Sequence, residues 1–147
     1  MNALKSVRAA VFDTMILIYL LENDPAYATV CEALFQRAEV GRLHGLITPI
    51  TMGEVLVKPL RAGLNELADR YRSALRNLPN VRLCDFTWKT GALAGALRAK
   101  YGLALPDLFQ VACAIENQAA LITNDKALKK IIEVPVFLLS DIQRAHS

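Results

Sequence analysis

Four acidic side chains of this 147-residue chain could together bind a divalent metal ion: Asp13, Glu54, Asp107 and Asp125. Carboxylate oxygens are the hard ligands that Mg²⁺ and Mn²⁺ prefer, and this set supplies them without His or Cys. An ion held in this way lowers the pKa of a bound water and polarises a phosphoryl oxygen, and two ions roughly 4 Å apart can contact both the attacking and the leaving oxygen. The reaction that these residues predict is therefore phosphodiester hydrolysis, with one ion or two.

Each of the four acids also has an ordinary structural explanation. Asp13 and Asp125 could each cap the helix expected to follow it. Asp107 would be favoured by the dipole at the start of a helix, and Glu54 could face solvent. Together, however, four carboxylates without matching cations repel one another and resist ionisation. A shared divalent ion removes that repulsion and offsets the cost of placing Glu54 among mostly apolar neighbours.

The elements that must position these acids alternate between strand-like and helix-like segments. Short apolar runs predict strands at 8–12, 44–48, 81–84, 120–123 and 136–139. Apolar residues at helical spacing predict helices at 14–21, 27–41, 50–58, 65–78, 87–101, 108–118 and 126–132. We expect Pro59 to end or kink the third of these helices. Strands separated by helices indicate a three-layer α/β/α sandwich with a central, mostly parallel sheet of four to five strands, spanning residues 1–147 as one domain.

The predicted sheet places the four acids at one edge, where ligands of parallel sheets bind beyond the carboxyl ends of the strands. Asp13 directly follows the first predicted strand, and Asp125 follows the fourth. Asp107 comes just after Pro106, which stands at a helix-start position. Glu54 lies early in the helix that follows the second strand. We therefore expect the four carboxylates to lie near one another.

Composition favours a folded protein of the cytoplasm. Hydrophobic residues make up 54% and charged residues 21% of the chain, which excludes disorder. The formal charge of +3 is too small to establish nucleic-acid binding by itself. Cys31, Cys84 and Cys113 are odd in number and far apart, so we expect reduced core thiols. His44 and His146 are not spaced as a zinc-ligand pair.

The sequence also argues against a membrane protein. Lys5 and Arg8 interrupt the N-terminal region, which lacks the layout of a signal peptide. The apolar stretch at 15–21 is far shorter than the ~20 residues that a membrane span requires. We therefore expect a cytoplasmic protein with no membrane partner.

Four segments carry a family resemblance: VFDTMILIYLLE at 11–22, ITPITMGEVLVKPLRAG at 47–63, LPDLFQVACAIENQAALITNDKAL at 105–128 and VPVFLL at 134–139. In order and spacing they resemble the PIN-domain family, most closely the VapC-type toxin ribonucleases of type II toxin–antitoxin systems. The resemblance implies a PIN-like fold, cleavage of RNA and dependence on Mg²⁺ or Mn²⁺. It also implies that Asp13, Glu54, Asp107 and Asp125 are the catalytic and metal-binding acids.

Residues beside the acids match the family less completely. Thr14 and Thr123 stand at polar positions, where their hydroxyls could orient a carboxylate or a bound water, or could instead cap a helix and end a strand. The family usually has Asn two residues after its first Asp, whereas this chain has Met15, which cannot donate a hydrogen bond. Losing a contact of that kind typically costs ~10- to 100-fold in metal affinity or activity. Asn124 is a candidate to supply a compensating amide.

Partner surfaces are less sharply predicted. RNA needs cations near its phosphates, and Lys126 adjoins the acidic edge. The arginines Arg70, Arg72 and Arg76 are more typical of a solvated helix face. The resemblance implies an antitoxin partner, and a homodimer is common in the family. An antitoxin groove could lie between the helices at 50–58 and 65–78, unless their apolar residues Val57, Leu60 and Leu64 belong to the core.

Two other functions are compatible with parts of this pattern. A haloacid-dehalogenase-type phosphatase also places an Asp after its first strand, but it needs a second Asp where this chain has Met15. A non-catalytic PIN-like module that binds RNA or protein would share the fold. The presence of all four acids favours catalysis, because a decayed site has no reason to keep mutually repelling carboxylates.

Overall fold

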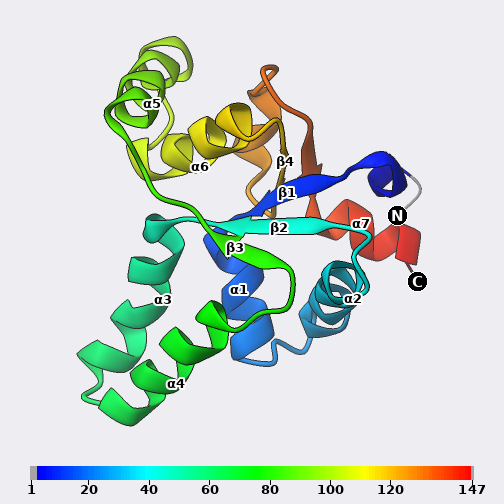
Figure 1. The fold of residues 1–147 in the computed structure, drawn as a ribbon, viewed down its shortest axis with the longest axis vertical. Helices are drawn as coiled ribbons and strands as arrows, with labels where there is room; N and C mark the ends of the chain where they lie inside the picture. Colours follow the sequence, from blue (N-terminus) through cyan, green and yellow to red (C-terminus); the bar gives the residue numbers. More distant parts are fainter. Residues whose placement is uncertain (1–2, 147) are drawn as a thin grey trace.

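The computed structural model describes residues 3–146, and within them five parallel strands form one sheet (Figure 1). The strands are β1 (Ala9–Phe12), β2 (His44–Ile47), β3 (Val81–Leu83), β4 (Ala120–Thr123) and β5 (Val136–Leu138). Their order is β3-β2-β1-β4-β5, so the first strand in sequence lies at the centre of the sheet. The α/β/α prediction is confirmed, and the sheet expected to be mostly parallel is parallel throughout.

Helices connect the strands and cover both faces of the sheet. They are α1 (Thr14–Leu21), α2 (Ala28–Glu39), α3 (Pro49–Arg61), α4 (Asn65–Arg76), α5 (Trp88–Tyr101), α6 (Leu105–Glu116) and α7 (Leu139–His146), with short 3₁₀ helices at Ala3–Ser6 (η1) and Lys126–Lys130 (η2). Figure 1 shows α5 and α6 on one side of the strands and α1 and α2 on the other.

Alternation along the strands explains this layering. Successive side chains of a strand point to opposite faces, so one buried strand contributes to two cores. Phe12 packs in the core that contains Ile16 of α1, whereas its neighbour Val11 packs in the core that contains Leu108 and Val111 of α6. The central strand is therefore buried on both faces, and this packing fixes the position of Asp13, the residue that follows it.

Three predicted elements need correction. Helix α3 continues through Pro59 to Arg61, because Pro59 lies near the helix end, where it removes one hydrogen bond, and its buried ring packs against neighbours. Helix α6 begins at Leu105 rather than 108, since the extended Ala104 already ends the loop. Leu139, expected in the last strand, instead begins α7, which the sequence analysis missed. Other bounds differ from the predicted ones by one or two residues.

The described residues agree with two further expectations. Cys31, Cys84 and Cys113 are free and buried. Within residues 3–146, no helix is both long and apolar enough to cross a membrane.

Gly45 provides a test of the packing around the central strands. A Cβ at position 45 would lie 2.5 Å from Cε2 of Phe12 and 2.9 Å from Cγ2 of Val81. We expect Gly45→Ala to lower the free energy of unfolding by about 1–3 kcal/mol, the usual cost of overpacking a core, measured by urea denaturation. Gly95→Ala is the control: a Cβ there meets nothing within 4 Å, so this exposed helical variant should be neutral or slightly stabilised. Equal stability of the two variants would contradict this packing.

Candidate functional site

The structure brings the four predicted acids to the carboxyl edge of the sheet. Asp13 directly follows β1, and Asp125 lies two residues after β4, which is the parallel neighbour of β1. Asp107 lies in the first turn of α6, and Glu54 in the second turn of α3. Burial raises the pKa of Asp107, and the charges of Asp13, Asp125 and Glu54 raise it further, to about 6. The four carboxylates therefore act on one another electrostatically.

Asp13 is the most buried of the four, with 8% of its surface exposed. The backbone N–H of Thr14 donates to its Oδ1 at 2.9 Å, and the hydroxyl of Thr123 donates to its Oδ2 at 2.6 Å. The side-chain amide of Gln110 lies 3.4 Å from Oδ1. Burial raises the pKa of Asp13, while these donors oppose the shift and the charge of Glu54 adds to it. Both carboxylate oxygens are thus fixed by donors from separate elements.

Glu54 is hydrogen-bonded to Thr14. The exposed side chain of Glu54 accepts a hydrogen bond of 2.6 Å from the Thr14 hydroxyl, which is buried at the start of α1. Helix α3 begins where it does because the Thr48 hydroxyl caps it and Pro49 occupies its first turn. The Thr14 hydroxyl thus contacts a carboxylate, and its role in orienting Glu54 stays a prediction.

Thr123 connects Asp125 to Asp13. Its hydroxyl accepts the backbone N–H of Asp125 at 3.1 Å and donates its own proton to Asp13. The Asp125 carboxylate accepts the N–H of Ala127 and caps η2, just as Asp13 accepts the first N–H of α1. Asp13 and Asp125 therefore both cap helices and also lie at the edge of the sheet that the other two acids share.

Three polar residues of the site escaped the sequence analysis: Thr48, Thr51 and Gln110. All three are buried, and Gln110 is only 1% exposed. Gln110 donates to the Thr51 hydroxyl at 2.8 Å and accepts from the Thr48 hydroxyl at 2.5 Å. The available signal was an amide inside the apolar run from Leu108 to Ile115, where an unpaired polar group would be costly.

Asn124 does not compensate for Met15. Its amide lies 3.4 Å from the Tyr19 hydroxyl, and its carbonyl accepts the N–H of Ser140 at 3.2 Å. Both ends of its side chain are thus engaged by Tyr19 of α1 and Ser140 of α7 rather than by an acid of the site, so that expectation is wrong. The amide beside Asp13 belongs to Gln110 instead.

The chemistry of the four acids fits a hard divalent cation, although no side-chain cluster is already arranged around one. Within residues 3–146, no three His, Cys, Asp or Glu side chains are placed to hold a metal ion. The four acids nevertheless offer only oxygen ligands, and none of them forms an ion pair with a described Lys or Arg. Glu54 and Asp125 are exposed to solvent; Thr14 donates to Glu54 at 2.6 Å, and the Asp125 carboxylate accepts the N–H of Ala127 at 3.0 Å.

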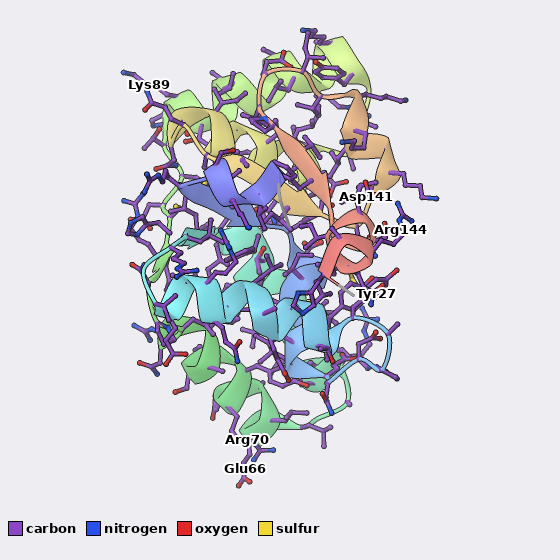
Figure 2. The ribbon with its side chains drawn as sticks, turned by 90° about the vertical axis from the view of Figure 1, so that its right-hand side faces the viewer. Tyr27, Glu66, Arg70, Lys89, Asp141 and Arg144 are labelled. Atoms are coloured by element: carbon purple, nitrogen blue, oxygen red, sulfur yellow. The ribbon has the colours of Figure 1, made fainter. Side chains whose placement is uncertain are left out.

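Basic residues divide between the site and the far surface. Lys126 is exposed directly beside Asp125. Arg72 pairs with Asp69 at 2.8 Å along α4. Figure 2 shows Arg70 of α4 at the opposite end of the molecule from Lys89 of α5. The arginines of α4 thus form a solvated helix face, as expected.

A groove of about 440 Å³ lies between α1, α3 and α4, lined by Leu21, Glu22, Lys58, Pro59, Ala62, Leu64, Leu67 and Tyr71. A smaller hollow shares four of these residues and reaches Met15 and Glu54, so the groove adjoins one of the four acids. Leu64 is 52% exposed, and Val57 and Leu60 are also exposed. These three residues are therefore surface rather than core.

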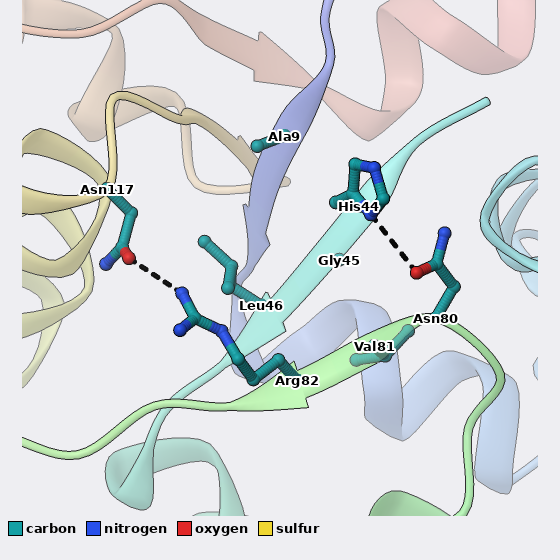
Figure 3. A pocket seen from close by; sticks show the side chains of 8 residues that line it. All are labelled: Ala9, His44, Gly45, Leu46, Asn80, Val81, Arg82 and Asn117. Atoms are coloured by element: carbon teal, nitrogen blue, oxygen red, sulfur yellow. Dashed lines mark hydrogen bonds between the residues drawn. The ribbon is translucent and has the colours of Figure 1, made fainter. Parts of the chain in front are cut away.

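Another pocket, of about 400 Å³, lies at the amino ends of β2 and β3 (Figure 3). Arg82 donates to Asn117 across it at 2.8 Å, and His44 and Asn80 form a second bridge at 3.1 Å. None of the described residues that line it is acidic. It is therefore separate from the site formed by the carboxylates.

Comparison with known proteins gives a consistent result. A family model of the PIN domain matches residues 10–134. No curated protein matches the sequence significantly. A toxin–antitoxin complex from Klebsiella pneumoniae is 29% identical, with a TM-score of 0.66 over 85% of this chain and 94% of that one.

Two further solved structures are similar in fold. VapBC2 from Rickettsia felis, bound to a DNA fragment from its promoter, has a TM-score of 0.70 at 19% identity, over 88% of this chain and 98% of that one. VapC20 from Mycobacterium tuberculosis, described as a sarcin–ricin loop cleaving toxin, has a TM-score of 0.66 at 15% identity, over 86% and 98%.

The raised pKa of Asp107 predicts a pH-dependent effect on stability. Between pH 3.8 and about 6, folded Asp107 holds a proton that the unfolded chain has released, so stability falls as pH rises through this range. In EDTA, Asp107→Asn should therefore be more stable than the wild type at pH 7.5 by about 1 kcal/mol, a value reduced for solvent screening. The gain should vanish near pH 4, as measured by urea denaturation.

The control for this prediction is Glu39→Gln, which changes an exposed acid at the end of α2. It should show no comparable gain at the higher pH. A stability difference between Asp107→Asn and the wild type that is the same at both pH values would contradict the electrostatic coupling.

Proposed function

The chain belongs to the PIN domain family, and from that premise we propose that it is a metal-dependent endoribonuclease, the toxin of a toxin–antitoxin pair. One observation carries the proposal: four carboxylates share the carboxyl edge of the sheet and form no ion pair with a described Lys or Arg, and burial together with the three other acids raises the pKa of Asp107. Cleavage of the sarcin–ricin loop, named for VapC20, supports RNA as the substrate class.

We propose that Asp13, Glu54, Asp107 and Asp125 hold Mg²⁺ or Mn²⁺. When bound, such an ion supplies Lewis-acid chemistry, which stabilises charge on phosphoryl oxygens and acidifies water. Donors bind both oxygens of Asp13, whereas Glu54 and Asp125 are exposed and are each held through one oxygen, by Thr14 and by Ala127, which would leave the other oxygen for the ion. The buried carboxylate would thus anchor the site, and the exposed ones would complete it.

The remaining residues of the site would orient the acids and bind the substrate. Thr14 holds Glu54, and Thr123 holds Asp13. At neutral pH Asp107, with its pKa of about 6, is mostly ionised and available as a ligand. Lys126, exposed next to Asp125, would bind an RNA phosphate as a point charge. A non-catalytic PIN-like module that binds RNA or protein is the alternative that the experiment below distinguishes.

We propose the groove between α1, α3 and α4 as the docking site of the antitoxin. It combines the exposed apolar Leu64 with Lys58 and Glu22, which form an ion pair of 3.3 Å at its wall. Solved relatives were crystallised as toxin–antitoxin complexes, one of them on promoter DNA. An apolar segment of the partner could occupy the groove and reach Glu54 through the adjoining hollow. The homodimer implied by the family stays a prediction, tested by the mass of the protein in solution.

We expect the purified chain to cleave structured RNA with Mn²⁺ or Mg²⁺, and EDTA to abolish cleavage. Asp13→Asn should lose more activity than the ~10- to 100-fold typical of a residue that only supports a metal ligand, because it removes a ligand charge. Asp24→Asn is the matched control, since Asp24 also caps backbone N–H groups, those of Ala26 and Tyr27 at 2.9 Å, but lies outside the site. Its activity should match the wild type.

Two outcomes would contradict the proposal. Cleavage that survives both EDTA and Asp13→Asn would point to another enzyme or a contaminant. RNA binding without metal-dependent cleavage by the wild type would favour the non-catalytic module.

The docking proposal predicts that Leu64→Asp weakens the complex with the cognate antitoxin. Leu64 is the N-cap of α4 and forms no capping bond there, so Asp suits the fold while placing a charge in the groove. We expect a loss of at least about 10-fold in affinity, as for an apolar anchor residue, measured by calorimetry. Val40→Asp, at a 68% exposed position after α2, is the control and should bind normally. Unchanged binding of Leu64→Asp would exclude the groove.

A further inference from the structure

Gln110 is a buried amide that contacts three side chains, two at the start of α3 and one directly after β1. It lies on α6, against the central strand, while α1 and α3 lie on the other side of that strand (Figure 1). Its Oε1 accepts from the Thr48 hydroxyl at 2.5 Å. Its Nε2 donates to the Thr51 hydroxyl at 2.8 Å and lies 3.4 Å from Oδ1 of Asp13. Both ends of the amide are therefore paired although the side chain is 1% exposed.

The partners of the amide determine which way it points. An ionised carboxylate only accepts hydrogen bonds, so the atom that faces Asp13 must be the nitrogen. The Thr48 hydroxyl then donates to the oxygen at the other end. A reversed amide would place its oxygen against a carboxylate oxygen of Asp13, and the two acceptors would repel each other.

This orientation sets the direction of a chain of hydroxyls. Thr51 accepts from Gln110, so its own proton is free to donate onward. The hydroxyls of Thr51 and Thr14 lie 3.2 Å apart, and the proton of Thr14 is committed to Glu54 at 2.6 Å. Thr51 therefore donates to Thr14, and the chain runs from Gln110 through two hydroxyls to Glu54 without an unpaired proton.

We infer that Gln110 is a positioning residue, which sets the orientation of the Asp13 carboxylate directly and that of Glu54 through Thr51 and Thr14. The inference rests on the proposed function and deepens it, because it names a residue that arranges two of the four acids for a cation. One amide thereby couples β1 and α3, whose acids are far apart in the sequence.

If Gln110 only filled space, a leucine at this position would serve as well. A leucine has nearly the volume of glutamine and would fill the space between α6 and the sheet. It would leave Thr48 and Thr51 without their buried partner and remove a donor from the neighbourhood of Asp13. The specific consequence is a loosened pair of ligands, which metal binding reports separately from stability.

The test compares Mn²⁺ affinity by calorimetry in the wild type, Gln110→Leu and Thr90→Val. Thr90 is the matched control: it is 1% exposed and donates a buried hydroxyl bond of 2.7 Å to Glu116, outside the acidic site. We expect Gln110→Leu to bind Mn²⁺ ~10- to 100-fold more weakly, the typical effect of losing a group that orients metal ligands, and Thr90→Val to bind normally. Excess Mn²⁺ should restore RNA cleavage by Gln110→Leu, which a general loss of folding would not allow.

Equal Mn²⁺ affinity of Gln110→Leu and the wild type would overturn the inference. If Gln110→Leu does not fold, Thr51→Val carries the test, because it keeps the side-chain shape and removes the hydroxyl that joins Gln110 to Thr14. It should weaken Mn²⁺ binding, and unchanged affinity would overturn the link to Glu54.

A spectroscopic measurement separates this inference from the proposed function. If the wild type binds no Mn²⁺, the proposed function fails, but the hydrogen-bond chain is still testable in metal-free protein by NMR. The side-chain amide protons of Gln110, assigned by their loss in Gln110→Leu, should exchange slowly with solvent. Thr48→Val and Asp13→Asn should each shift their resonances, because each removes a direct partner. Rapid exchange, or resonances indifferent to both variants, would overturn the inference.

Discussion

The site depends on a single buried carboxylate. Asp13 ends the central strand, so burial is imposed on it by helices packed against both faces of the sheet. A buried charge persists only when hydrogen bonds or a counterion compensate for its lost hydration. The donors come from Thr14, Thr123 and Gln110, on α1, β4 and α6. Each of these hydrogen bonds stabilises the charge of Asp13 and also holds the helix or strand of the donor next to Asp13.

The other acids are arranged around this anchor. Thr14 reaches from the anchor to Glu54, and Thr123 connects it to the backbone of Asp125. Asp107 is not joined to this anchor by a hydrogen bond of the described residues. Burial and the repulsion of its three acidic neighbours raise its pKa instead. The result is a concentration of negative charge with little compensation from the described basic residues, which suits a divalent cation. The repulsion that would favour a cation at this edge therefore also destabilises the folded protein when no cation is bound.

Sequence reasoning located most of the site because the decisive signals are local. A buried strand that ends in Asp13, and another followed by Asp125, can be recognised from apolar runs alone, and the parallel sheet then places both at one edge. The start of α6 was missed by three residues, but Asp107 still falls in its first turn. Pro59 was misjudged because its ring is compatible with the helix once the lost bond lies near the C-terminus.

The polar network could not be predicted in the same way. Gln110 and Thr51 are 59 residues apart, and their bond depends on how α6 and α3 approach β1. Asn124 adjoins Asp125 in the sequence, yet its side-chain carbonyl accepts the N–H of Ser140 in α7, an element that was not predicted. Hydrogen-bond direction is a tertiary property, so residue type alone indicates only that a buried amide needs partners.

The most direct test of the central claim is a crystal structure of the protein with Mn²⁺, using anomalous scattering at the manganese edge. We predict a peak among Asp13, Glu54, Asp107 and Asp125, with carboxylate oxygens roughly 2 Å from the ion and the Glu54 and Asp125 side chains turned toward it. A protein that takes up no ion at these four carboxylates, or binds Mn²⁺ only elsewhere, would contradict the proposed metal site.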